Sequence, residues 1–215
     1  MKNIKTRDMV LMGIITALLI VFSMTPIGTI PIGPLSVSLN VIPVAIAAVA
    51  LGPAGGAIAG GIFGILSFLQ CFGIGVPSGM GAILVGINPF LAFVQRFVPR
   101  LLDGLLIGFV FRGTGRKSNP YVASAVTGFC SALFNTVLFM SALMLLFGNT
   151  EYVQGLMENM GTDNVFIFIC LFVGINAVVE MVVSTIITGA VGSALFHAKL
   201  IQLPTNHTQP NNKSA

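Results

Sequence analysis

Long apolar runs follow one another along the chain, separated by short polar segments or segments rich in Gly and Pro. A bilayer core of about 30 Å needs roughly 20 predominantly apolar residues per helix. The runs therefore predict six transmembrane helices, at about residues 8–24, 37–51, 54–72, 90–111, 120–147 and 165–196. Gly52-Pro53 separates the second helix from the third, because proline lacks a backbone donor and disfavours helix in the residue before it.

Composition supports a membrane protein. Of the 215 residues, 55% are hydrophobic and only 7% are charged, and the mean hydropathy is +0.99. Soluble domains carry roughly 25% charged residues, and a soluble protein of this size could not bury so much apolar surface. We therefore expect an all-α integral membrane protein, with one six-helix membrane domain over residues 1–200. Residues 201–215 are polar and are expected to form a disordered cytoplasmic tail.

The basic residues predict the orientation of the helices. They precede the first helix, lie between the fourth and fifth, and follow the sixth: Lys2, Lys5, Arg7, Arg112, Arg116, Lys117, Lys199 and Lys213. The connections after the first, third and fifth helices contain no Lys or Arg. The positive-inside rule then places both termini in the cytoplasm of a multi-pass plasma-membrane protein. Membrane topology thus accounts for the net charge of +4, and no nucleic-acid partner is expected.

The sequence offers little for catalysis or metal binding. Cys71, Cys130 and Cys170 lie singly in apolar runs, with no second Cys or His at metal-ligand spacing, and are interpreted as inert buried thiols. Neither a phosphate-cradling GxxxxGK[ST] motif nor an HExxH motif is present. We expect no catalytic residues, no metal site and no cofactor bound by this chain.

Several polar residues lie inside the predicted spans. The charged ones are Arg96, Arg100, Asp103 and Glu180, and a charge at the bilayer centre costs at least about 2.5–3.5 kcal/mol. At about 1.5 Å per residue, Arg100, Asn176 and Asn135 lie about 15, 16 and 18 Å from the outer ends of their helices. These three side chains could therefore share one level of the membrane.

Two interpretations of these charges remain open. Arg100 could pair with Asp103 or Glu180, so that the ions only fix helix packing. Alternatively, the polar residues form a solute site between the fourth, fifth and sixth helices, with an anionic ligand because a guanidinium fork matches a carboxylate. Pro99 adds a further expectation, since its missing donor frees the carbonyl group near Gln95 and favours a kink.

Small residues recur at four-residue spacing on two helices. Gly56, Gly60 and Gly64 follow this pattern in the third helix, and Gly13 and Ala17 follow it in the first. Such faces let helices approach closely. We expect the glycines of the third helix to pack within the protein, whereas Gly13 and Ala17 are candidates for docking a partner subunit.

Four stretches resemble the S components of energy-coupling factor (ECF) transporters over about residues 6 to 196. TPIGTIPIGPLSVSLNVIPVAIAAVALGPAGGAIAGGIFGILSF is similar to the region from the first loop to the third helix of that family. The stretches FVPRLLDGLLIG, LFNTVLFMSALML and INAVVEMVV resemble the pantothenate-specific branch. The resemblance implies a six-helix subunit that captures a vitamin and joins a transmembrane coupling protein with two ATP-binding-cassette ATPases, which hydrolyse the ATP.

The resemblance also implies roles for individual residues. Arg100 or Arg96 would take the carboxylate of pantothenate, and Asn135, Asn176 and Asn40 its neutral groups, with Glu180 nearby. Gly13 and Ala17 match the small residues with which the family contacts the coupling protein. The outer segments at about 25–36 and 73–88 would form a lid.

Other functions compete with this interpretation. The ligand could be another vitamin. The chain could be a self-contained proton-coupled carrier that uses Asp103 and Glu180, or an intramembrane enzyme in which the same carboxylates act as acid and base. It could also be an assembly subunit without a ligand, in which the polar cluster serves only packing.

Overall fold

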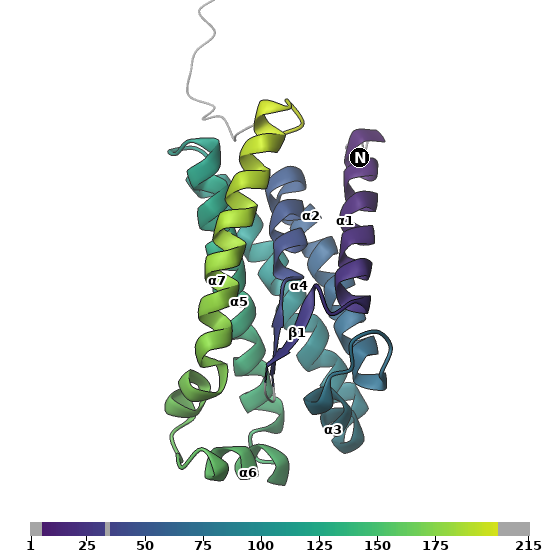
Figure 1. Ribbon diagram of the computed structural model, residues 1–215, viewed down its shortest axis with the longest axis vertical. Coiled ribbons are helices and arrows are strands. Elements are labelled where there is room, and N and C mark those ends of the chain that lie inside the picture. Colours follow the sequence, from purple (N-terminus) through teal and green to yellow (C-terminus); the bar gives the residue numbers. More distant parts are fainter. Residues whose placement is uncertain (1–5, 33–34, 202–215) are drawn as a thin grey trace, which may run out of the picture.

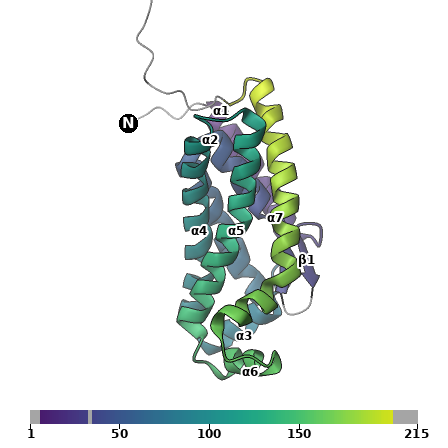
Figure 2. The same ribbon diagram turned by 90° about the vertical axis from the view of Figure 1, so that its left-hand side faces the viewer.

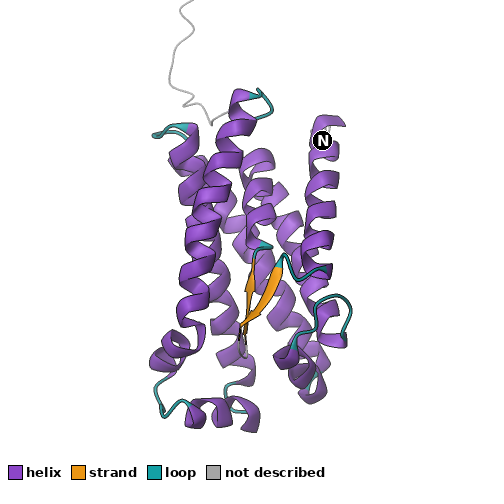
Figure 3. Ribbon diagram, viewed as in Figure 1, coloured by secondary structure: helices purple, strands orange, loops and turns teal. Residues whose placement is uncertain are grey.

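The computed structural model describes residues 6–32 and 35–201, and helices dominate it (Figure 3). Five long helices form the body: α1 (Thr6–Met24), α2 (Val41–Leu69), α4 (Pro89–Thr114), α5 (Pro120–Phe147) and α7 (Val165–His197). The connections hold shorter elements: β1 (Thr29–Ile32), β2 (Leu35–Ser38), η1 (Gln70–Phe72), α3 (Gly79–Ile87) and α6 (Glu151–Asn159). The predicted tail, from residue 202 on, lies outside the described residues.

The predicted break at Gly52-Pro53 is confirmed, and it divides α2 into two arms. Gly52 has φ +74° and ψ −166°, which lies outside the helical region and which glycine adopts without steric cost. The arms fold back on each other, so that a Cβ at Gly56 would lie 3.0 Å from the Cβ of Ala48. Residues 41–51 and 53–69 are therefore two helices joined by a tight turn.

Asparagine side chains cap three of the helices. The Asn88 side chain accepts hydrogen bonds from the backbone N–H groups of Phe90 and Leu91, both at 3.1 Å. Asn119 does the same for Val122 at 2.8 Å, and Asn164 caps α7. Pro89 and Pro120 follow the first two caps, at a position where no backbone donor is needed. The predicted start of the fifth helix at residue 120 is confirmed.

The connections hold more structure than predicted. The outer segment at about 25–36 was expected to be a loop, but β1 and β2 pair in it as an antiparallel hairpin, with Thr29 opposite Ser38. The segment 73–88 contains α3, and the connection between α5 and α7 contains α6. The second helix begins at Val41 rather than 37 because β2 occupies residues 35–38.

Four helical stretches are long and apolar enough to cross a membrane: Thr6–Met24, Val41–Phe72, Pro120–Phe147 and Asn176–His197. The helix α4 is also long, but its apolar sequence is interrupted by three charged residues, Arg96, Arg100 and Asp103. On α7 the buried side chains include Asn176, Glu180, Ser184 and Thr188, whereas Val178, Val182 and Ile186 are exposed. Polar side chains inside the protein and apolar side chains outside are expected for a helix whose outer face contacts lipid.

The long helices run roughly parallel to one axis of the molecule (Figures 1 and 2). The start of α1, the turn between α4 and α5 and the end of α7 lie at one end, and α3 and α6 lie at the other. The described residues form two large clusters of buried apolar side chains and one smaller cluster. The first includes Leu19, Val44 and Phe63, and the second includes Leu84, Phe139 and Phe168.

Close backbone contacts join the second arm of α2 to α4. A Cβ at Gly56 would overlap the carbonyl group of Gly104, and one at Gly60 would overlap the carbonyl group of Arg100. At Gly64 a Cβ would lie 2.8 Å from the Cα of Phe97. The prediction that these three glycines serve packing inside the protein is therefore confirmed. They fix the position of the part of α4 that carries the arginines.

Candidate functional site

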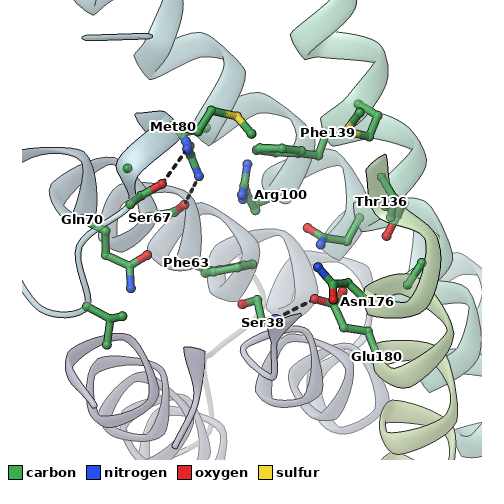
Figure 4. Close-up of a pocket in the computed structure, with 18 of the residues that line it drawn as sticks. Ser38, Phe63, Ser67, Gln70, Met80, Arg100, Thr136, Phe139, Asn176 and Glu180 are labelled. Carbon is green, nitrogen blue, oxygen red and sulfur yellow. Dashed lines mark hydrogen bonds between the residues drawn. The ribbon is translucent and has the colours of Figure 1, made fainter. Parts of the chain in front are cut away.

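A cavity of about 370 Å³ lies between α2, α4, α5 and α7 (Figure 4). Its lining draws on both apolar clusters, with Phe63 from the first and Phe139 from the second. The polar and charged lining residues are Ser38, Ser67, Gln70, Ser78, Arg96, Arg100, Asn135, Thr136, Tyr152, Asn176 and Glu180. A pocket of this size that combines polar and charged groups with aromatic and aliphatic side chains fits a small polar molecule.

Arg100 is placed by the proline beside it. Pro99 has no N–H group, so the carbonyl oxygen of Gln95, four residues earlier, lacks its helical donor. The guanidinium Nη1 of Arg100 donates to that oxygen at 3.4 Å. The predicted free carbonyl at Gln95 is therefore confirmed, and the guanidinium group occupies it. The helix α4 continues across Pro99, which lies inside it.

Two aromatic rings flank the Arg100 guanidinium. Its Cζ lies 4.4 Å from the centre of the Phe139 ring and 5.3 Å from that of Phe63. The negative faces of aromatic rings attract a cation, more strongly where water is excluded. Arg100 is only 6% exposed, and its Nε atom is buried without a hydrogen-bond partner among the described residues. The side chain lines the cavity with donors still available for a ligand.

Arg96, one helical turn away, is bound mainly to the protein. Its Nη2 donates to the hydroxyl of Ser78 at 3.0 Å, and its Nη1 donates to the hydroxyl of Ser67 at 3.4 Å. Ser78 is also the N-cap of α3, where its hydroxyl accepts from the backbone N–H of Gly81 at 3.2 Å. Arg96 therefore ties the segment before α3 to α2 and α4, although it also lines the cavity.

Glu180 lies on the opposite wall, on α7. Its Oε1 accepts a hydrogen bond of 2.6 Å from the backbone N–H of Ser38, at the end of β2. Asn176 lies one turn away on the same helix, and both side chains face the cavity beside Ser38 (Figure 4). The wall formed by α7 and the hairpin thus presents a carboxylate and an amide.

The first of the two interpretations, a pairing of Arg100 with Asp103 or Glu180, is not found. Within residues 6–32 and 35–201, the only contact between oppositely charged side chains within 4.0 Å is Arg7–Asp8. Asp103 does not line the cavity, and its Oδ2 instead accepts from the hydroxyl of Ser131 at 3.2 Å. The proton-coupled alternative required Asp103 and Glu180 together, but only Glu180 faces the cavity.

The two remaining residues predicted to bind the small molecule, Asn135 and Asn40, differ in their positions. Asn135 lines the cavity from α5, and its Oδ1 is buried without a hydrogen-bond partner in the described part of the chain. Asn40 is fully buried outside the lining. Its side chain bonds to the hydroxyls of Ser23, at 3.3 Å, and Ser38, at 3.5 Å. Asn40 thus supports the hairpin that carries Ser38, and does not reach the cavity.

Several lining residues were not predicted from the sequence. Phe63 and Phe139 look like ordinary residues of apolar runs, and Ser67 and Ser78 are single serines in segments rich in Gly or apolar residues. Tyr152 enters the lining from α6, and burial raises the pKa of its phenol. A signal for Ser78 did exist, because serine is a preferred N-cap residue.

The candidate docking face on α1 is open. A Cβ at Gly13 would meet no atom within 4 Å, and Ala17 is exposed. Neighbouring apolar residues of α1, such as Ile14 and Leu18, are also exposed.

The geometry suits a small molecule with an anionic group and several neutral polar groups. A guanidinium group with free donors lies on one wall, and a carboxylate and amides lie on the others. No cluster of three His, Cys, Asp or Glu residues that could hold a metal ion occurs in the described residues.

Comparison with known proteins points to transport. A sequence model of the family described as "ECF transporter, substrate-specific component" matches residues 7–192. A pantothenate transporter, PanT, of Leuconostoc mesenteroides is 28% identical over 200 residues, which cover 91% of this chain and 95% of that protein. A pantothenic acid transporter, PanT, of Lactococcus lactis is 26% identical over 213 residues, covering 93% of this chain and 98% of that protein.

Proposed function

The chain belongs to the family of substrate-specific components of ECF transporters and is a multi-pass protein of the plasma membrane, and we propose that it captures pantothenate with high affinity for import. The names of its two relatives support this ligand. The observation that carries the proposal is Arg100, a buried cation that faces the cavity without a carboxylate partner among the described residues.

The chemistry of pantothenate matches the lining of the cavity. The molecule has one carboxylate, one amide and two hydroxyl groups. The Arg100 guanidinium would take the carboxylate, because it is the cation with donors to spare. Asn135 and Asn176 would bind the neutral groups, and Arg96 would hold the outer segment closed over the ligand.

The proposed topology has six spans, with the two arms of α2 counted separately. Both termini and the turn between α4 and α5 would lie in the cytoplasm, where the basic residues gather. The cavity, the hairpin, α3 and α6 would then face the outside. The hairpin and the segment before α3 would form the lid through which the vitamin enters.

Transport would depend on partner subunits. The chain would join a transmembrane coupling protein and two ATP-binding-cassette ATPases, with Gly13 and Ala17 of α1 against the coupling protein. The partners would bind and hydrolyse ATP, and this chain would bind no cofactor and catalyse no reaction. A self-contained carrier is less well supported, because Asp103 lies outside the cavity.

The test is the binding of pantothenate to the purified protein in detergent, measured by calorimetry. Arg100→Gln should weaken binding at least thirtyfold, because losing one partner of a buried charge pair costs about 2 kcal/mol or more. Arg112→Gln is the matched control, since Arg112 lies on the same helix but outside the lining. No binding by the wild-type protein would exclude pantothenate as the ligand. Equal binding by both variants would exclude Arg100 as its partner.

A further inference from the structure

The cavity carries opposite charges on opposite walls. Arg96 and Arg100 lie on α4, and Glu180 lies on α7. No nitrogen of either guanidinium group lies within 4.0 Å of the Glu180 carboxylate. The charges face the same space from two sides, with the Phe139 ring beside the guanidinium groups. A ligand held between these walls meets a cation with one part and an acid with another.

The Glu180 carboxylate has capacity for a ligand. Its Oε1 accepts from the backbone N–H of Ser38 at 2.6 Å, and this is its only hydrogen bond within the described residues. The side chain lines the cavity although it is only 6% exposed. In its ionised form the Glu180 carboxylate accepts hydrogen bonds and cannot donate them. The other carboxylate oxygen, Oε2, can therefore accept a hydrogen bond from the ligand.

The groups that adjoin Glu180 on its own wall carry no positive charge, and the Arg100 guanidinium faces it from the opposite wall. Asn176 precedes it by one helical turn, and Ser38 contacts it from β2. Asn135, on the neighbouring helix α5, has a buried Oδ1 without a partner in the described part of the chain. Amide and hydroxyl groups can bind a neutral donor, but they cannot neutralise a second anionic group.

We propose that Glu180 is a specificity-determining residue. It accepts a hydrogen bond from an uncharged donor at the end of the ligand remote from its carboxylate, and it excludes ligands that carry a second anion at that end. The inference rests on the proposed function, since it takes the Arg100 end for the carboxylate of pantothenate. The donor is then the terminal hydroxyl group.

Phosphorylation of that hydroxyl provides the sharpest contrast. It removes the hydrogen-bond donor and adds a charge of about −1.5 to −2 at neutral pH. The phosphate would lie against a buried carboxylate, and like charges brought together at a desolvated contact are strongly disfavoured. The wild-type site should therefore take the free vitamin and reject its phosphate ester.

The experiment compares two ligands, pantothenate and 4′-phosphopantothenate, by calorimetry on purified full-length protein. Wild type should bind the phosphorylated ligand at least 100-fold more weakly than pantothenate. Glu180→Gln keeps the side-chain volume and an acceptor for the Ser38 N–H but removes the charge. This variant should lower the ratio of the affinity for pantothenate to the affinity for 4′-phosphopantothenate at least tenfold. Glu158→Gln is the matched control, because it removes the same charge from exposed α6 and should leave the ratio unchanged.

A second measurement needs no variant. Wild type should bind a pantothenate analogue that lacks the terminal hydroxyl at least tenfold more weakly than pantothenate, and an unchanged affinity would overturn the proposal. So would equal binding of pantothenate and its phosphate by wild type, or an unchanged ratio in folded Glu180→Gln protein. A wild-type protein that does not bind pantothenate would instead remove the proposed function.

Discussion

Pro99 and Arg100 act as a pair at the residue scale. The proline leaves the Gln95 carbonyl oxygen without its helical donor, and the next residue supplies a guanidinium N–H in its place. A charged donor is thereby oriented in an apolar environment without a carboxylate partner. The helix defect thus positions the cation that is proposed to bind the ligand.

Replacing Pro99 tests this pairing. In Pro99→Ala the backbone N–H of residue 99 would bond to Gln95 and release the Arg100 side chain. We expect an equal or higher thermal unfolding temperature, since proline in a helix interior costs about 3 kcal/mol, but pantothenate binding weakened severalfold. Pro120→Ala, at the first position of α5, should leave the affinity unchanged. Tighter binding by Pro99→Ala would contradict the pairing.

Ser78 connects Arg96 to the segment before α3. Ser78→Ala removes the cap of α3 and the acceptor of a charged hydrogen bond, at a cost of about 1 kcal/mol for the cap and about 1.5–3 kcal/mol for the bond. Because the segment 73–88 would be held less tightly, we expect faster proteolysis there and faster dissociation of pantothenate. Ser78→Thr keeps the hydroxyl and should behave nearly as wild type. An unchanged dissociation rate in Ser78→Ala would rule out this role.

The polar site residues were predictable to the extent that charge in an apolar run is costly. That cost singled out Arg96, Arg100 and Glu180, but it singled out Asp103 equally, and Asp103 lies outside the lining. Asn40 was predicted as a polar residue within an apolar span, but its side chain bonds to Ser23 and Ser38 and is not part of the lining. Glu180 accepts a hydrogen bond from the backbone N–H of Ser38, and the residue type at position 38 does not reveal a contact of this kind. The aromatic rings beside Arg100 resemble any other apolar residues of a membrane helix.

At the scale of the elements, the lengths of the apolar runs and the positions of Pro and Gly predicted where helices begin and end. The fifth helix, at 120–147, was predicted to the residue, and the break at Gly52 was found because Gly-Pro cannot continue a helix. The hairpin was missed because TIPI and LSVS are short strands, one of them interrupted by proline. The helix α6 was missed because EYVQGLMEN lacks the long apolar run used to identify helices.

The contact between α2 and α4 should be intolerant of any side chain. A Cβ at Gly60 would overlap the Arg100 carbonyl group, so Gly60→Ala must push the two helices apart. Overpacking of this kind costs typically 1–3 kcal/mol, and we expect a lower unfolding temperature and weaker pantothenate binding. Gly86→Ala on α3 is the control, since a Cβ there meets nothing within 4 Å. Equal stability of the two variants would contradict the close contact.

At the scale of the whole molecule, a substitution on α1 should reduce transport without changing the affinity for pantothenate. Gly13→Leu on α1 would fill the open face without approaching the cavity. We expect unchanged pantothenate affinity in the isolated protein, but uptake reduced at least tenfold in cells that contain the ATPase and coupling subunits.

The matched control for that variant is Leu18→Trp. Leu18 is also exposed on α1, but it lies about 140° around the helix from Gly13 at 100° per residue. The control should retain uptake, measured with labelled pantothenate. Loss of uptake in both variants, or in neither, would show that Gly13 and Ala17 do not define the docking face.

The glycine contacts between α2 and α4 have a mechanical consequence for the cavity. Because the Arg100 carbonyl group rests on Gly60, the wall that carries the guanidinium groups cannot move without its neighbour. The opposite wall is also held from outside the cavity, because the Ser184 hydroxyl of α7 donates to the Gly128 carbonyl oxygen of α5 at 2.9 Å. The paired helices α2 and α4 therefore form a rigid unit, and the position of both guanidinium groups is set by contacts made outside the cavity. A ligand has to fit the spacing that this unit fixes, rather than draw the guanidinium groups toward itself.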